Sequence, residues 1–123
     1  MSPQVLIADD EKLLRNLLLE KLQIENISAG SAENGVDALE MLRTNPGVAV
    51  LITDVRMPRM GGYELVEQAL KMQPELKILM MTGYALDQAP PEWALRAREF
   101  RMFRKPFDLD RLTDLLREML SRP

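Results

Sequence analysis

The sequence predicts an α/β fold in which an open parallel β-sheet is covered by α-helices on both faces. Short apolar runs recur along the chain without the alternation of a half-exposed strand, which is typical of strands buried on both faces. Longer segments with a helical spacing of apolar residues lie between these runs. Strands and helices that alternate in this way form parallel sheets with helical crossovers. A length of 123 residues suits a single domain, spanning 1–123.

Five segments are expected as strands. Three of them are nearly uninterrupted apolar runs, namely VLIA at 5–8, VAVLIT at 48–53 and KILMMT at 77–82. Two are weaker, namely ISAGSA at 27–32 and FRMF at 100–103. The pairs Asn34-Gly35 and Lys105-Pro106 follow the two weaker segments and are turn signals that mark their ends.

The segments between and after the strands are expected to be helical. In four of them apolar residues recur three or four positions apart: Leu14, Leu17, Leu18 and Leu22; Val36, Leu39 and Leu42; Leu65, Val66, Ala69 and Leu70; and Leu109, Leu112, Leu115, Leu116, Met119 and Leu120. The segment 83–99 is the least regular. Because Pro90-Pro91 fits only the first turn of a helix, we expect a long loop and then a short helix carrying Trp93 and Ala97. The sum is a (βα)5 chain.

Composition excludes several classes of protein. A net charge of -3 argues against a dedicated nucleic-acid binder, so no direct nucleic-acid contact is expected. The absence of cysteine excludes disulfides and thiolate metal sites, which makes a reducing cytoplasm the expected compartment. The absence of histidine removes the usual general base and any phosphohistidine of the chain's own. No apolar stretch approaches the roughly 20 residues of a membrane span, and MSPQVLIADD lacks the basic start of a signal peptide.

Polar residues stand at the carboxyl ends of four predicted strands: Asp9, Asp10, Asp54, Thr82 and Lys105. Ligands of open α/β sheets bind at this edge. Clustered carboxylates without histidine or cysteine suit a hard cation such as Mg²⁺. A lysine adds a positive charge for a phosphoryl oxygen, and a threonine adds a hydroxyl donor. A carboxylate nucleophile, a divalent ion, a lysine and a hydroxyl together make a phosphoryl-transfer site.

Each of these residues also has a purely structural interpretation when it is taken alone. Asp10 could cap a helix, Asp54 could end a strand in a turn, and Thr82 could be an ordinary strand residue. The methionines at 57, 60, 80 and 81 are interpreted as packing residues. The functional interpretation depends on the conjunction of five polar features at separate strand ends or turns.

The motifs together resemble the receiver domain of response regulators, the CheY-like superfamily of two-component phosphorelay systems. The residues that carry the resemblance are Asp9-Asp10, Asp54 with Met57-Pro58 and Gly61-Gly62, Thr82-Gly83, and Lys105-Pro106-Phe107. They occur in the family's order and cover essentially the whole chain. The resemblance implies a flavodoxin-like, doubly wound five-stranded parallel sheet in the order 2-1-3-4-5.

The resemblance also implies the roles of the site residues. Asp54 would be the phosphoacceptor, phosphorylated by a histidine kinase or a histidine phosphotransfer protein, and Lys105 and the Thr82 hydroxyl would contact the phosphoryl group. Mg²⁺, with Mn²⁺ as the alternative ion, would be bound by Asp54, Asp10 and the main-chain carbonyl of Arg56, with Asp9 acting through metal-bound water.

The loop behind Asp54 would hold the Arg56 carbonyl on the metal and turn sharply at Gly61-Gly62, so that the next helix starts close to the sheet. The bond before Pro106 would be cis.

The sequence departs from the family at the switch. Phosphorylation in the family draws an aromatic residue inward at the position that Met102 holds here, and alternation points Phe103 to the opposite face. We expect the loop from Gly83 to Gln88 to respond most. Arg56 and Tyr84 stand at the positions that tune hydrolysis of the phosphoaspartate. Both side chains are bulky and would hinder access of water, so we hypothesise a long-lived phosphorylated state.

Basic residues cluster near the end of the chain: Arg96, Arg98, Arg101, Arg104 and Lys105. They could form an ordinary solvated face or a surface for an acidic partner. The resemblance implies an output surface there, made by the fourth helix, the fifth strand and the fifth helix, which are segments 83–99, 100–103 and the helix from Asp108. A downstream protein would bind it, and the chain would be a monomer or a weak dimer.

Three functional classes remain open. The favoured one is a stand-alone receiver that signals by protein contact, without a DNA-binding module after residue 123. The second is a receiver excised from a hybrid histidine kinase or a longer regulator, which would relay phosphate. The third is an aspartate-nucleophile phosphatase, in which a second aspartate would follow two positions after the first. Here Glu11 follows the pair Asp9-Asp10, so a metabolic enzyme is not expected.

Overall fold

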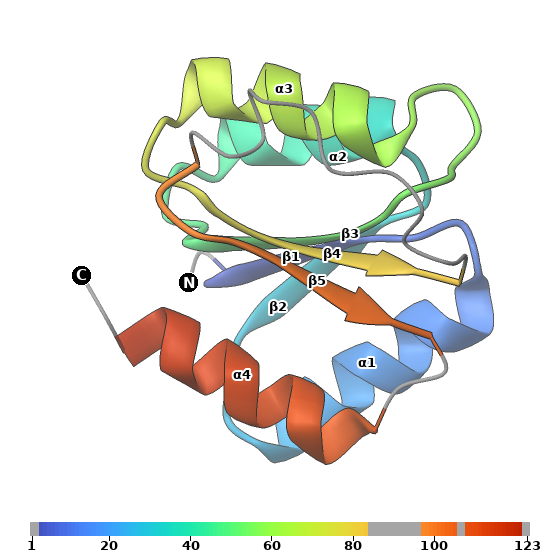
Figure 1. Ribbon diagram of the computed structural model, residues 1–123, viewed down its shortest axis with the longest axis vertical. Helices are drawn as coiled ribbons and strands as arrows, with labels where there is room; N and C mark the ends of the chain where they lie inside the picture. Colours follow the sequence, from blue (N-terminus) through green and yellow to red (C-terminus); the bar gives the residue numbers. More distant parts are fainter. Residues whose placement is uncertain (1–2, 84–96, 106–107, 122–123) are drawn as a thin grey trace.

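The computed structural model describes residues 3–83, 97–105 and 108–121. Within these residues five strands and four helices follow one another (Figure 1), in the order β1 (Val5–Ala8), α1 (Lys12–Ile24), β2 (Ala29–Ala32), α2 (Gly35–Thr44), β3 (Val50–Asp54), α3 (Gly62–Met72), β4 (Lys77–Thr82), β5 (Phe100–Arg104) and α4 (Leu109–Ser121). The strands form one sheet in the order β2-β1-β3-β4-β5, and every neighbouring pair is parallel. The predicted fold class and strand order are confirmed.

Helices cover both faces of the sheet (Figure 1). Helices α2 and α3 lie on one face, and α1 and α4 lie on the other. Alternate residues of the central strands point into the two cores, so that Leu51 packs on the α2–α3 side and Ile52 on the α1–α4 side. Both side chains are fully buried. The unbroken apolar runs of the sequence reflect this burial on both faces.

Strand β2 begins later than the sequence predicts, because the capping turn that follows α1 includes Ile27, the first residue of the run. Asn26 adopts a positive φ of 61°, and the amide of Ile27 donates to the carbonyl of Leu22 at 2.8 Å. This is a left-handed helix ending, which keeps Ile27 out of the sheet although its side chain is buried. The strand therefore starts at Ala29.

The loop behind Asp54 corrects one expectation about its glycines. The positive φ lies at Arg59, with a value of 67°, whereas Gly61 has a φ of -76°. Gly62 is required for close approach instead, because a Cβ there would lie 2.1 Å from the main-chain oxygen of Asp54. Helix α3 thus starts directly against the end of β3, as the sequence predicts, while the sharp turn comes earlier.

Several predictions fall outside the described residues. They are the short helix around Trp93, the position of Tyr84 and the cis bond before Pro106. The response expected of the loop from Gly83 to Gln88 also falls outside, except for Gly83 itself. Ala97 is described, and it packs against the core on the α2–α3 side. Among the described residues, no helix has the length and apolar character needed to cross a membrane.

Candidate functional site

The predicted site residues stand at the carboxyl ends of neighbouring strands. Asp9 follows β1, Asp54 ends β3, Thr82 ends β4 and Lys105 follows β5. The parallel registers align these ends, since Asp54 pairs with Met81 and Thr82 pairs with Arg104. Residues that are far apart in the sequence therefore meet at one edge of the sheet.

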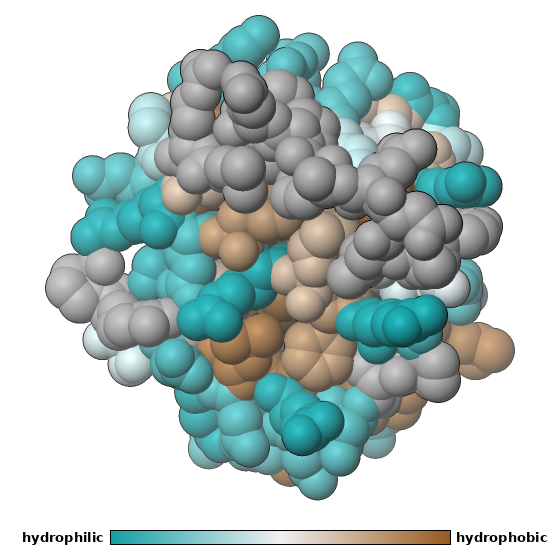
Figure 2. Space-filling view, viewed as in Figure 1, coloured by the Kyte–Doolittle hydropathy of each residue, from teal (hydrophilic) through white to brown (hydrophobic). Residues whose placement is uncertain are grey.

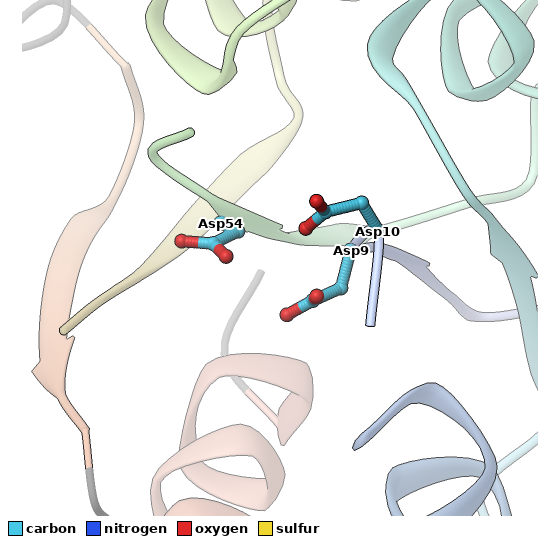
Figure 3. Close-up of side chains that lie close together, drawn as sticks. All are labelled: Asp9, Asp10 and Asp54. Carbon is cyan, nitrogen blue, oxygen red and sulfur yellow. The ribbon is translucent and has the colours of Figure 1, made fainter. Parts of the chain in front are cut away.

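Three carboxylates form an acidic cluster at this edge. Asp9, Asp10 and Asp54 each offer one carboxylate oxygen, and these oxygens lie within 4.8 Å of one another (Figure 3). Asp9 is fully buried, Asp54 is partly buried and Asp10 is exposed. Such a set of hard oxygen ligands could hold a divalent cation.

Lys105 supplies the positive charge beside the cluster. Its Nζ lies 3.1 Å from Oδ2 of Asp54 and 3.3 Å from Oδ2 of Asp9. A third carboxylate, that of Glu11, lies 3.8 Å from the same nitrogen. The main chain places Lys105 at this point, because its amide donates to the carbonyl of Thr82 at 2.7 Å.

Burial and the neighbouring charges shift the pKa of two groups in the site. Burial raises the pKa of Asp9, and the negative charge of Asp54 raises it further. The Glu11 amide and the Lys105 ammonium oppose that rise without cancelling it. For Lys105, burial lowers the pKa, but the hydrogen bond that its ammonium donates to Asp54 and the negative charge of Asp9 outweigh this effect, so the net shift is upward. The site therefore holds an ammonium group among carboxylates, one of which ionises reluctantly.

Local hydrogen bonds orient the two inner carboxylates. Oδ1 of Asp9 accepts from the Glu11 amide at 2.8 Å, and Oδ1 of Asp54 accepts from the Val55 amide at 2.8 Å. Glu11 is the N-cap residue of α1 and makes no side-chain cap bond. Asp10 is thus not the helix cap that its sequence position also allowed.

An open cavity of about 420 Å³ lies above the inner carboxylates, lined by Asp10, Glu11, Asp54, Arg56, Gly83 and Lys105. Arg56 lines this cavity, while its role as a carbonyl ligand stays a prediction. Glu11 was missed as a site residue, although its position directly after the aspartate pair was a usable signal. Thr82 is buried and is not among these lining residues.

Strand β5 places the residues of the expected switch. Met102 packs against the core on the α2–α3 side, whereas Phe103 packs on the α1–α4 side. The expectation that alternation sends Phe103 to the opposite face is confirmed. Met102 is partly buried, next to β4 and paired with Met80.

Comparison with known proteins identifies relatives that match nearly all of this chain. It is 32% identical over 117 residues to the response regulator receiver protein CpdR of Brucella abortus, covering 95% of this chain and 96% of the relative. It is 33% identical to a segment of the sensor kinase CckA of the same organism, covering 98% of this chain but 13% of the kinase. The chain thus spans nearly all of one relative and a small part of the other.

Solved structures agree with these relatives. The response regulator protein TrrA of Thermotoga maritima, in complex with Mg²⁺ and BeF, superposes with a TM-score of 0.80 at 30% sequence identity, covering 94% of this chain and 96% of that chain. The family model described as the response regulator receiver domain matches residues 5–117. The strand order, the acidic cluster with its lysine, and these matches show that the chain belongs to the response regulator receiver domain family of two-component systems.

Proposed function

We propose that this chain is a phosphoacceptor signalling domain in which Asp54 accepts a phosphoryl group from a histidine kinase or a histidine phosphotransfer protein. One observation carries the proposal: Asp54 lies at the cavity wall within an acidic cluster and is held by Lys105 at 3.1 Å. A carboxylate is a known nucleophile for phosphoryl groups, and a nearby cation is what the transferred charge requires.

The residues present fit a magnesium ion. Asp10 and Asp54 would bind it directly with the main-chain carbonyl of Arg56, and Asp9 would act through a bound water. A divalent ion supplies charge neutralisation for the carboxylates and the phosphoryl oxygens. The Mg²⁺ in the TrrA complex supports this ion, given 30% identity between the two chains. Mn²⁺ has the same preference for oxygen ligands and is the alternative.

In the transfer, a carboxylate oxygen of Asp54 forms a bond to phosphorus while the bond from phosphorus to the donor's imidazole nitrogen breaks. The leaving imidazole nitrogen keeps the electron pair of that bond and takes up a proton from solvent. Lys105 would exchange its contact with Asp54 for a phosphoryl oxygen, and the Thr82 hydroxyl would donate to another. The phosphoaspartate carries a charge of about -1.5 to -2 where the carboxylate carried a single negative charge, and it brings further acceptor oxygens, which can bias a two-state element of the protein.

The switch would use Thr82 and Met102 on adjacent strands. Met102 lacks the ring of the family's usual aromatic residue, so its movement carries less directional information. Arg56 is exposed at the cavity wall, where its guanidinium can limit access of water to the phosphoaspartate. Together with Tyr84 it motivates the hypothesis of a long-lived phosphorylated state.

Different faces would serve the donor and the downstream protein. Large apolar side chains are exposed on α1, which begins at the cavity rim, and they would receive the donor: Leu13, Leu17 and Ile24. Figure 2 shows hydrophobic and hydrophilic surface side by side on the face along which β5 runs in Figure 1. Arg101 and Arg104 of β5 are exposed there, which would suit an acidic downstream partner whose binding weakens with salt.

A relay role within a longer protein is the second candidate. The match to a segment of the sensor kinase CckA supports it, because that segment is 13% of a larger kinase. An aspartate-nucleophile phosphatase is disfavoured, since Glu11 stands where such enzymes carry a second aspartate. A single domain over 1–123, a cytoplasmic location and a monomer or weak dimer complete the proposal.

The proposal is tested by mixing the protein with acetyl phosphate and Mg²⁺ and measuring its intact mass. We expect one added phosphoryl group on the wild type, and none on Asp54→Asn or after removal of divalent ions by a chelator. Asp114→Asn is the matched control, because Asp114 is an exposed carboxylate on α4. Decay of the adduct then reports its lifetime.

Two results would contradict these statements. A phosphoryl group that remains on Asp54→Asn would place the acceptor elsewhere. A half-life of seconds for the wild-type adduct in Mg²⁺ would contradict the hypothesis of a long-lived state, while leaving the acceptor unchanged.

A further inference from the structure

The loop that joins β3 to α3, residues 55–61, contains a strained turn. Arg59 has a φ of 67°, and the amide of Met60 donates to the carbonyl of Pro58 at 2.7 Å. A hydrogen bond between residues two apart, around a central residue of positive φ, is the rare and strained form of the γ-turn. A residue other than glycine keeps such a conformation only where the surrounding structure holds it.

Contacts from the first turn of α2 hold this strained turn. Gly35 opens α2, and a Cβ at that position would lie 2.5 Å from the main-chain oxygen of Met60 and 2.7 Å from its Cβ. A guanidinium nitrogen of Arg59 lies 3.6 Å from Oδ1 of Asp37. Any side chain at position 35 would therefore displace the main chain of the loop, since the nearest atom is not the end of a flexible side chain.

The first turn of α2 is itself well ordered by its cap. The side chain of Asn34 accepts from the Asp37 amide at 2.8 Å and donates to Oδ2 of Asp37 at 3.0 Å. Asn34 is buried and both bonds are partly buried, so they are only partly accessible to water. The Asp37 carboxylate is thereby oriented so that Oδ2 accepts from Asn34 and Oδ1 faces Arg59.

The other end of the loop is fixed to the sheet. The amide of Gly62 donates to the carbonyl of Val55 at 2.9 Å, and Gly62 packs against the main chain of Asp54. Arg56 lies between this fixed base and the turn held by α2, on the wall of the cavity. A shift of the turn must therefore be absorbed by the few residues that include Arg56.

We propose that Gly35 and Asp37, at the amino end of α2, are positioning residues for the phosphoacceptor site: they hold the Pro58–Met60 turn and, through it, the main chain of Arg56. The inference rests on the proposed function, which assigns the Arg56 carbonyl to the divalent ion. Gly35 and Asp37 are not among the residues that line the cavity, so they act through the loop.

The test compares Mg²⁺ affinity, measured by titration calorimetry, in the wild type, Gly35→Ala and Asp37→Asn. We expect affinity to fall about three- to tenfold in both variants, less than the roughly 10- to 100-fold loss on removing a direct hydrogen-bond partner of a ligand. Amide hydrogen exchange at 56–60, measured without Mg²⁺, should become faster. Asp37→Asn adds no volume, so it keeps the test valid if Gly35→Ala does not fold.

Gly30→Ala is the matched control. Gly30 lies on β2, and a Cβ there would meet the flexible end of Met41 at 3.3 Å. This variant makes the same chemical change away from the loop, so it should keep wild-type Mg²⁺ affinity and wild-type exchange at 56–60.

The outcomes separate this inference from the proposed function. Wild-type Mg²⁺ affinity in the folded variants would overturn the inference, even if Gly35→Ala unfolds at a lower temperature, because the contact would then serve only the fold. Absence of Mg²⁺ binding by the wild type would contradict the proposed function instead. The rate of amide hydrogen exchange at 56–60, compared between the variants and the wild type, would still decide whether the first turn of α2 holds the loop.

Discussion

Asp9 is an ionisable side chain with no exposed surface, placed beneath the cavity beside Lys105. Its pKa is raised chiefly by burial, so the folded protein holds the ionised carboxylate less readily than the unfolded chain does. A divalent ion would relieve this cost. The most buried residue of the acidic cluster is thus expected to lower the stability of the fold at neutral pH when no cation is bound.

We expect Asp9→Asn to be more stable than the wild type at neutral pH without Mg²⁺. The amide has no charge, and its oxygen can still accept from the Glu11 amide. In the folded protein the pKa of Asp9 lies above its ordinary value of 3.8. The free-energy cost of ionising this buried carboxyl is therefore fully present at a pH above the folded pKa, and it disappears as the pH falls below the ordinary pKa.

The advantage of the variant should therefore shrink on acidification, as measured by thermal unfolding from neutral pH down to about pH 4. Asp114→Asn controls for loss of a negative charge at the surface. A variant that is less stable than the wild type at neutral pH would show that the pair with Lys105 outweighs the cost of burial.

At the scale of elements, α1 and α4 share one face of the sheet and are joined by charged residues. Lys21 Nζ of α1 lies 2.6 Å from Oδ1 of Asp110 on α4 and 3.1 Å from Oε1 of Glu25. Arg117 of α4 pairs with Glu25 in turn. The hydrogen bond from Arg117 lowers the pKa of Glu25, and that from Lys21 lowers the pKa of Asp110.

We expect Lys21→Met to lower the free energy of unfolding at neutral pH and to do so less in acid. A carboxyl group whose pKa is lowered in the folded state stabilises the fold at any pH above its ordinary pKa, which is 4.5 for Glu25 and 3.8 for Asp110. That stabilisation is lost as the pH falls through the folded pKa. The difference between variant and wild type should vanish in this range and also diminish in high salt.

Urea unfolding at several pH values measures this difference. Lys71→Met is the control, since Lys71 is an exposed lysine in the last turn of α3. A difference that persists unchanged in acid would assign the effect to packing of the Lys21 stem instead of its charge.

At the scale of the whole molecule, the sheet separates two cores that share the same strands. A change in a central strand therefore affects both faces, and we expect the described domain to unfold as one unit. Leu51→Ala should lower the free energy of unfolding by about 2–5 kcal/mol, the usual cost of a cavity in a packed core. Leu51 is fully buried on the α2–α3 side.

Leu13→Ala makes the same change at a side chain that is 86% exposed, and it should shift stability by no more than about 0.5 kcal/mol. Far- and near-ultraviolet circular dichroism, followed through one urea titration, should report the same midpoint for every variant. Separate midpoints for the two signals would contradict the proposal of a single domain over 1–123.

Much of the fold and of the site was predictable because it depends on local patterns. The runs VLIA and KILMMT indicated strands buried on both faces, and the aspartates and lysine after the strands indicated the site. Alternation along β5 was sufficient to place Met102 and Phe103 on opposite faces. These signals need only the period of a strand and the direction of a parallel sheet.

Other features were not predictable because they arise where separate elements meet. The start of β2 depended on how α1 ends at Asn26. The positive φ at Arg59 is held by α2, and Glu11 joined the site because its carboxylate reaches Lys105. The conformational preferences of these residues do not indicate such contacts.

By itself, the sequence determined the order of strands and helices, the faces of their side chains, and the kinds of polar group at the sheet edge. Each is a property of neighbouring residues and of one repeating geometry. Only the tertiary structure decided that Asp9 is fully buried, that Lys105 lies between Asp9 and Asp54, and that α2 holds the turn at Arg59. The reason is that burial and distance depend on the packing of segments that are distant in the sequence.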